Sequence, residues 1–111
     1  MTDLKEHHEY IYNRIKYFEI DEETKEESVF LLAGLTKITY RYENNSVRRR
    51  VEPIKTKHFE LPIHEAPKFH EFIPEGVISV NITKYEYERL LEICDEEPVA
   101  LFCFNLFKND D

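Results

Sequence analysis

Lysine and arginine side chains gather in the middle of the chain, where they could bind an anionic partner. Residues 29–58 carry seven Lys or Arg against two acids, whereas residues 1–28 carry nine acids against four bases and residues 59–111 carry twelve against four. An arginine fork forms paired hydrogen bonds with phosphate or carboxylate groups. The middle block therefore predicts a binding surface, and its candidate cations are Lys37, Arg41, Arg48, Arg49 and Arg50.

Three kinds of anionic neighbour fit these cations. The first is the protein's own acids, chiefly Glu22, Glu23, Glu26 and Glu27. The second is nucleic acid or another phosphate ligand, because Tyr40 and Tyr42 could stack bases. A chain with a pI near 5.1 is repelled by polyanions, which makes nucleic acid the less favoured partner. The third is an acidic protein or a second copy of the chain.

The acidic segment around Glu22 offers a different chemistry. On a helix, Glu22 and Glu26, like Glu23 and Glu27, would lie one turn apart, at about 5–6 Å, close to the spacing of phosphates along a nucleic acid. Such a row can imitate DNA in the groove of an enzyme, and complementary charge speeds the association. Fifteen bases against 23 acids is a mild excess for a strict DNA mimic, so a protein interface of both charge signs fits better. A solvated helix face is the plain alternative.

Histidines recur at intervals of six residues in the proline-rich segment 52–75. They are His58, His64 and His70, and Glu60 lies close to the first. Imidazole and carboxylate groups bind zinc, manganese or iron. The chain has no HExxH motif and no paired-cysteine motif, so these four residues are weak metal candidates and no resident cofactor is expected.

The sequence gives little support for covalent catalysis or for nucleotide hydrolysis. None of the three serines lies in a strand–turn–helix elbow, and two glycines cannot form a phosphate-binding loop. Cys94 and Cys103 lie among apolar residues, which predicts buried free thiols. We therefore expect no catalytic residue.

Hydropathy periods predict the elements that position these residues. A capping box and apolar residues at helical spacing predict a helix over 4–17. Asp21 as N-cap and Gly34 as the C-terminal stop predict a second helix, with a strand from Val29 as the alternative.

After this segment the period changes to two, which predicts a hairpin over 35–51 with Asn44 and Asn45 in its loop. This loop pairs Ile38 with Val51, Tyr40 with Arg49, and Tyr42 with Val47. Lys37, Arg41, Arg48 and Arg50 would then share the opposite face. A slip by one residue would exchange the faces of one strand.

The rest of the chain predicts strands at 57–61 and 76–82 and a helix that begins with a capping box at Thr83. The apolar segment 99–107 predicts a last strand, which at an open sheet edge would form a homodimer. The fold class expected is α+β, in the order α-α-β-β-(loop)-β-α-β, with two to three helices on a mainly antiparallel sheet. A chain of 111 residues predicts a single domain.

The short, acidic, Tyr- and Phe-rich composition resembles that of phage and plasmid accessory proteins. The absence of a signal-peptide layout or a long apolar run predicts a cytoplasmic protein without membrane contact. The leading hypothesis is a non-catalytic regulator or inhibitor that docks through its sorted charge on a protein, a nucleic-acid-handling protein being the first to consider. The alternative is a nucleotide-like ligand binder or metal-dependent hydrolase that uses the hairpin arginines and the loop 57–75.

Overall fold

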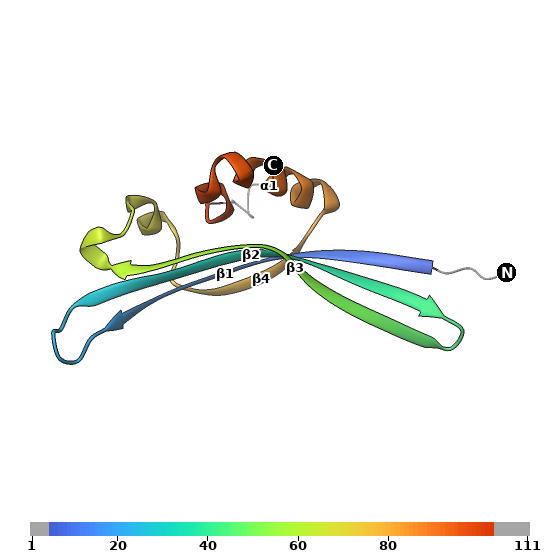
Figure 1. Ribbon diagram of the computed structural model, residues 1–111, viewed down its shortest axis with the longest axis horizontal. Coiled ribbons are helices and arrows are strands. Elements are labelled where there is room, and N and C mark those ends of the chain that lie inside the picture. The colour runs from blue at the N-terminus through green and yellow to red at the C-terminus, as the bar shows by residue number, and fades with distance from the viewer. Residues whose placement is uncertain (1–4, 104–111) are drawn as a thin grey trace.

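The computed structural model describes residues 5–103 as a four-stranded antiparallel sheet in the order β3-β2-β1-β4 (Figure 1). The strands are β1 (Lys5–Ile20), β2 (Glu27–Glu43), β3 (Ser46–Pro62) and β4 (Gly76–Ile82). The helical elements are α1 (Lys84–Glu96) and three short 3-10 helices, η1 (Ile63–Glu65), η2 (Lys68–Phe72) and η3 (Pro98–Leu101).

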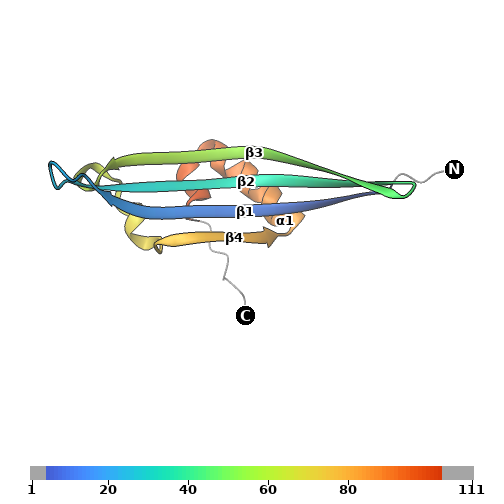
Figure 2. The same ribbon diagram turned by 90° about the horizontal axis from the view of Figure 1, so that it is seen from below.

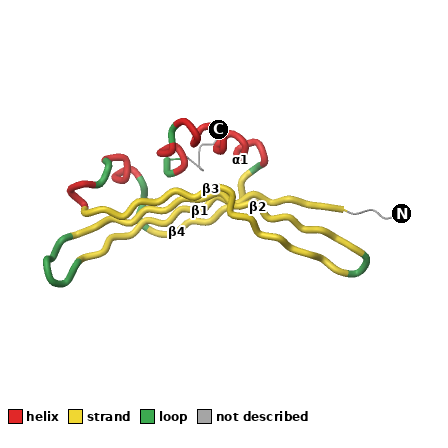
Figure 3. Tube along the Cα trace, viewed as in Figure 1, coloured by secondary structure: helices red, strands yellow, loops and turns green. Residues whose placement is uncertain are grey.

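The helical elements lie on one face of the sheet, which we call the covered face (Figures 1 and 3). Side chains on the other side, the open face, have no second layer over them in the described part of the chain (Figure 2). The hydrophobic core lies between the covered face and α1, η2 and η3, and includes Tyr12, Leu31, Leu35, Leu90 and Leu101.

Polar side chains of β1 anchor the C-terminal segments to the covered face. Tyr12 Oη donates a hydrogen bond to the carbonyl of Leu101 at 2.6 Å, and Arg14 donates to the carbonyl of Phe102 at 3.0 Å. Lys16 Nζ donates to the carbonyls of His70 and, at 2.8 Å, Ile73. These bonds explain how β1 can carry polar groups beneath a packed layer.

The predicted fold class is wrong. Of the described residues, 58% are strand and 25% helical, with one α-helix, so the chain is mostly antiparallel sheet and its order of elements differs from the predicted one. The predicted helix over 4–17 lies in β1 over its described part. Apolar residues occur on both faces of β1, which pairs with β2 along its whole length, and this mixed pattern fits a helical and a strand period alike.

The predicted second helix is also wrong, and the strand alternative is correct. Asp21 does not cap a helix but holds a turn, since its carboxylate accepts hydrogen bonds from the backbone N–H groups of Glu23 and Thr24 at 2.8 and 3.0 Å. Lys25 completes the turn with a φ of 62°. The apolar segment that follows, including Val29, belongs to β2.

The hairpin prediction is confirmed in its loop and register, although both strands are longer than predicted. The predicted strand 57–61 is the end of β3, beyond a bulge at Ile54. The predictions for β4 and α1 are confirmed as well, including the capping box between Thr83 and Glu86.

The predicted strand 99–107 is wrong over its described part. Residues 98–101 form η3, and Leu101 and Phe102 are buried in the core. Residues 104–107 lie outside the described residues. A dimer through an open strand edge at this position has no strand to form it in the described segment.

Candidate functional site

Beyond the helical layer, β2 and β3 continue as a hairpin, which we call the hairpin arm (residues 37–52; Figures 1 and 2). The start of β1 runs beside it, with Lys5 opposite Tyr42. Because side chains alternate along a strand, one face of the arm carries most of its charge. This basic face comprises Lys37, Arg41, Arg48 and Arg50, and it continues the covered face of the sheet past the end of α1.

A hollow of about 530 Å³ lies on the basic face, between the arm and the start of β1. Its lining residues are Glu6, His8, Lys37, Thr39, Arg41, Arg48, Arg49, Arg50 and Glu52. Cations and hydroxyl or imidazole groups therefore outnumber the two carboxylates around it.

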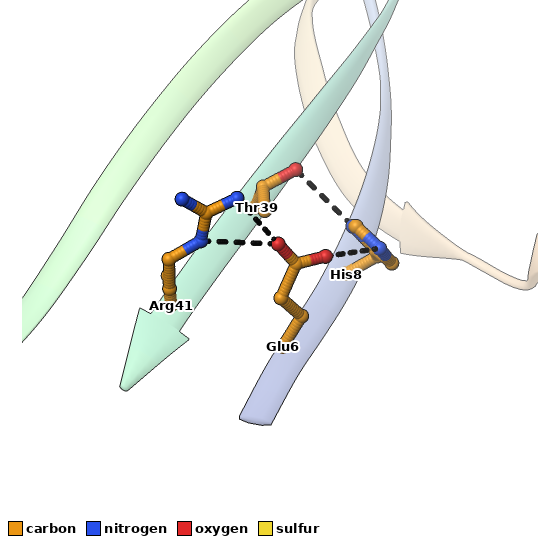
Figure 4. A network of polar contacts seen from close by, with 4 residues as sticks. All are labelled: Glu6, His8, Thr39 and Arg41. Atoms are coloured by element: carbon orange, nitrogen blue, oxygen red, sulfur yellow. Dashed lines mark hydrogen bonds and ion pairs between the residues drawn. The ribbon is translucent and has the colours of Figure 1, made fainter. Parts of the chain in front are cut away.

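One of the carboxylates that line the hollow, that of Glu6, is held by a polar network (Figure 4). Arg41 donates two hydrogen bonds to the same oxygen of Glu6, from Nε at 3.1 Å and from Nη2 at 2.7 Å. These bonds hold the pKa of Glu6 below its ordinary value and raise the pKa of Arg41. His8 lies 3.8 Å from the other Glu6 oxygen and is hydrogen-bonded to Thr39 at 3.1 Å.

Acidic side chains form ion pairs with only some of the other cations of the arm. Arg50 lies 3.2 Å from Glu52, and both are on β3. Within residues 5–103, no acid lies at ion-pair distance from Lys37, Arg48 or Arg49. Arg48 stands directly across the strands from Arg41, and like charges in such a cross-strand pair destabilise a sheet. The pair of Arg41 and Arg48 therefore does not stabilise the sheet, whereas the pair of Arg41 and Glu6 does.

The acids that could have paired with the arm lie at the other end of the molecule. Glu22, Glu23, Glu26 and Glu27 are in or beside the β1–β2 turn, which Figure 1 places opposite the hairpin arm. At about 3.4 Å per residue, β2 separates this turn from the β2–β3 loop by about 50 Å. Because the turn is not helical, it does not present the one-turn spacing on which imitation of DNA was predicted.

The tyrosines of the arm point away from its basic face. Tyr40 lies on the open face, where its hydroxyl donates to Glu9 at 3.3 Å and its ring stacks on His7 at a centroid distance of 6.0 Å. Tyr42 lies on the same face and is 43% exposed. Stacking of bases on these rings and binding of phosphates by the basic face would therefore occur on opposite sides of the arm.

The four weak metal candidates do not come together. His58 and Glu60 lie on the open face of β3, His64 lies in η1 at 3.6 Å from Glu26, and His70 is buried in η2. The Nδ1 atom of His70 has no hydrogen-bond partner in the described structure. Among the residues that can be described, no group of three His, Cys, Asp or Glu could hold a metal ion.

Neither cysteine has the features of a nucleophile. Cys94 is buried, and burial raises the pKa of its thiol. Cys103 is exposed, which corrects the prediction that it is buried, and desolvation also raises the pKa of its thiol. Both thiols are therefore kept in the protonated, less reactive form.

Sequence reasoning missed the contribution of β1 to the site. Glu6 and His8 reach the hollow because β1 is a strand paired with β2, whereas the predicted helix would have directed them elsewhere. The sequence of β1 carries no clear signal for a strand, because the apolar residues Tyr10, Ile11 and Tyr12 are consecutive and do not alternate with polar ones.

Comparisons with protein-family models, curated proteins and solved structures gave no match. No α-helix in the described residues has the length and apolar character needed to cross a membrane.

Proposed function

We propose that the protein is a non-catalytic binding protein, which docks the basic face of its hairpin arm on an acidic surface of a protein partner and thereby regulates or blocks that partner. A nucleic-acid-handling protein is the first partner to test. The observation that carries the proposal is the cross-strand pair of Arg41 and Arg48, in which Glu6 pairs with Arg41 while no acid of the described residues pairs with Arg48. Two like charges in this position cost stability, and an acidic partner would offset that cost.

The shape of the molecule separates its charges and supports this docking. The hairpin arm carries five cations and two acids, whereas residues 19–27 at the opposite end carry six acids and one base. The Debye length is about 8–10 Å at physiological salt, so a separation of about 50 Å screens each end from the other. The net charge of −8 therefore does not describe the field that a partner meets at the arm.

A protein fits the basic face better than nucleic acid does. Glu6 and Glu52 lie within the cationic hollow and would repel a run of phosphates, whereas a protein surface can present both charge signs. The two tyrosines that could stack bases are on the opposite face of the arm.

The proposal is tested by reversing charge on the basic face. The R48E/R50E variant should lose partner capture from a lysate at low salt, while its circular dichroism spectrum stays that of the wild type and its melting temperature does not fall. The K25E/K68E variant makes the same change in net charge at exposed lysines away from the arm, and should capture the partner normally. Capture by R48E/R50E at the wild-type level would refute docking through the basic face.

A second candidate is a small anionic ligand, such as a nucleotide, in the hollow. Its volume of about 530 Å³ is typical of ligand sites, which span about 300–1,000 Å³. The loop 57–75 cannot join such a site, because Lys57 pairs with Ala33, about 27 Å along β2 from Arg41. Calorimetric titration with inorganic phosphate and with nucleoside triphosphates tests this candidate, and no heat of binding at millimolar ligand would remove it.

A further inference from the structure

The open face of the sheet carries apolar side chains at both of its ends. The arm cluster consists of Ile38, Tyr40, Tyr42, Val47 and Val51. The turn cluster, near the β1–β2 turn, consists of Ile15, Tyr17, Phe30, Leu32 and Val77. In the turn cluster the members are cross-strand neighbours, and Tyr17 stacks on Phe30 at a centroid distance of 4.9 Å. In the arm cluster Ile38 faces Val51 and Tyr42 faces Val47, and Tyr40 lies between these two pairs, opposite Arg49.

Five of these side chains are exposed, namely Tyr17, Tyr42, Val47, Val51 and Val77, whereas Ile38 is buried and the other four are half-buried. Val77 is 69% exposed, Val47 57%, Val51 47% and Tyr17 38%. Single exposed apolar residues are normal on a protein surface, but a continuous apolar area on one face of a sheet marks an interaction site. The helices lie on the other side of the sheet and leave this face bare (Figure 2).

The middle of the open face is different. Gly34 is buried there, and a Cβ atom on it would lie 3.3 Å from both Asn13 Oδ1 and the carbonyl oxygen of Lys55. Thr36 and Thr56 flank it. In Figure 1 the sheet bends so that the β1–β2 turn and the hairpin arm both drop toward the open side. A partner surface would therefore meet the two apolar clusters and leave a polar gap between them.

We infer that the open face binds a second copy of this chain, with the strands of the two copies antiparallel and a two-fold axis near Gly34. In this arrangement the arm cluster of each copy packs on the turn cluster of the other. About this axis, Phe30 of one copy lies over Tyr40 of the other, because each residue stands five positions along β2 from Leu35, the neighbour of Gly34.

Charge complementarity selects this arrangement over the parallel one. A parallel dimer would place the two hairpin arms together and the two acidic turns together, which brings like charges into contact. The antiparallel dimer sets each arm against an acidic turn. On the open face itself, Arg49 is paired with Tyr40 and Glu60 is paired with Phe30, so the same axis that stacks these rings sets Arg49 of one copy near Glu60 of the other.

The available area is close to that of a stable interface. Residues 30–42 span about 44 Å at 3.4 Å per residue, and three strands are about 14 Å wide, which gives about 600 Å² per copy. Standard interfaces bury about 800 Å² per partner, and water in the polar gap is compatible with binding. The dimer leaves the basic face of each arm free, so the inference does not depend on the proposed function.

Sedimentation equilibrium of the full chain from 1 to 100 µM tests the dimer. The wild type should reach twice the chain mass of 13.5 kDa within this range. The Y42K/V51K variant should be monomeric, whereas F72K/Y85K, which adds the same charge at exposed apolar residues elsewhere, should dimerise like the wild type. A monomeric wild type at 100 µM, or a Y42K/V51K variant that dimerises normally, would overturn the inference.

A charge swap tests the antiparallel arrangement. R49E and E60R should each weaken dimerisation by about three- to tenfold, since each sets like charges together twice in a symmetric dimer. The R49E/E60R double variant should regain most of the wild-type affinity. If the double variant dimerises no better than the weaker single variant, the two residues do not meet and the antiparallel arrangement is wrong. Circular dichroism of each variant shows that the sheet is intact.

Discussion

The two ends of the sheet differ, because helical elements lie over only one of them (Figure 1). At the β1–β2 end, η1 and η2 lie over the sheet, and Lys16 is buried there with two backbone carbonyls as acceptors. At the other end, Lys37 lies on the same face of the sheet, but nothing in the described chain packs on the hairpin arm. Strand pairing is continuous at both ends of the sheet. Only the helical cover therefore distinguishes Lys16, which has a structural role, from the cations of the hairpin arm, which are available for binding.

The largest expected effect is on stability and separates these two lysines. Lys16→Ala should lower the free energy of unfolding by about 2–4 kcal/mol, because it leaves a cavity and two buried carbonyls without a donor. Lys37→Ala should change it by no more than about 0.5 kcal/mol, as is usual for surface residues. Urea unfolding measures both values. Equal losses of unfolding free energy in the two variants would mean that Lys37 contributes as much to stability as Lys16 does.

Glycine substitutions in the β1–β2 turn and in the β2–β3 loop should change the free energy of unfolding by smaller amounts. Lys25 and Asn44 both have positive φ, at 62° and 48°. Lys25→Gly should raise the free energy of unfolding by about 0.5–1 kcal/mol, because it removes the steric cost of the left-handed conformation. Asn44→Gly should gain less, since asparagine tolerates this conformation. Thermal unfolding of the two variants compares them, and a larger gain at Asn44 would contradict this reasoning.

The smallest expected effect is on the pKa of Glu6, which tests whether Glu6 and Arg41 are paired beside the hollow. Hydrogen bonds from Arg41 lower the pKa of Glu6 below its ordinary value, so the ion pair stabilises the fold above the unfolded-state pKa and loses this contribution as the pH falls through the lowered pKa. A carbon-detected NMR titration should show this low pKa in the wild type. In R41Q the pKa should return toward its ordinary value, and an unchanged pKa would mean that the pair is absent in solution.

Local signals made part of the fold predictable from the sequence. The β2–β3 hairpin is specified by strict alternation and by Asn44 and Asn45, and α1 by its capping box. The strand β1 lacks such signals, because Ile11 and Ile15 fit a helical stripe as well as one face of a strand. Its conformation follows from pairing with β2 and β4, which no local pattern reveals.

Part of the candidate site was predictable from the sequence and part was not. The hairpin register placed Lys37, Arg41, Arg48 and Arg50 on one face. Whether acids covered that face depended on tertiary structure, and the long strands carry Glu22 and its neighbours to the far end of the molecule. Glu6 enters the hollow from β1, about 35 residues away from Arg41 in the sequence, so no short-range pattern could have identified it.

The most direct test of the central claim is the unfolding free energy of the single variant R48E, measured by urea denaturation. If the basic face serves a partner and not the fold, replacing one member of the Arg41–Arg48 cross-strand pair by an acid should raise the free energy of unfolding by about 0.2–1 kcal/mol. Partner capture should fall in the same variant. A lower free energy of unfolding for R48E would show that Arg48 supports the fold, and would contradict the claim that the hairpin arm holds its arginines open for binding.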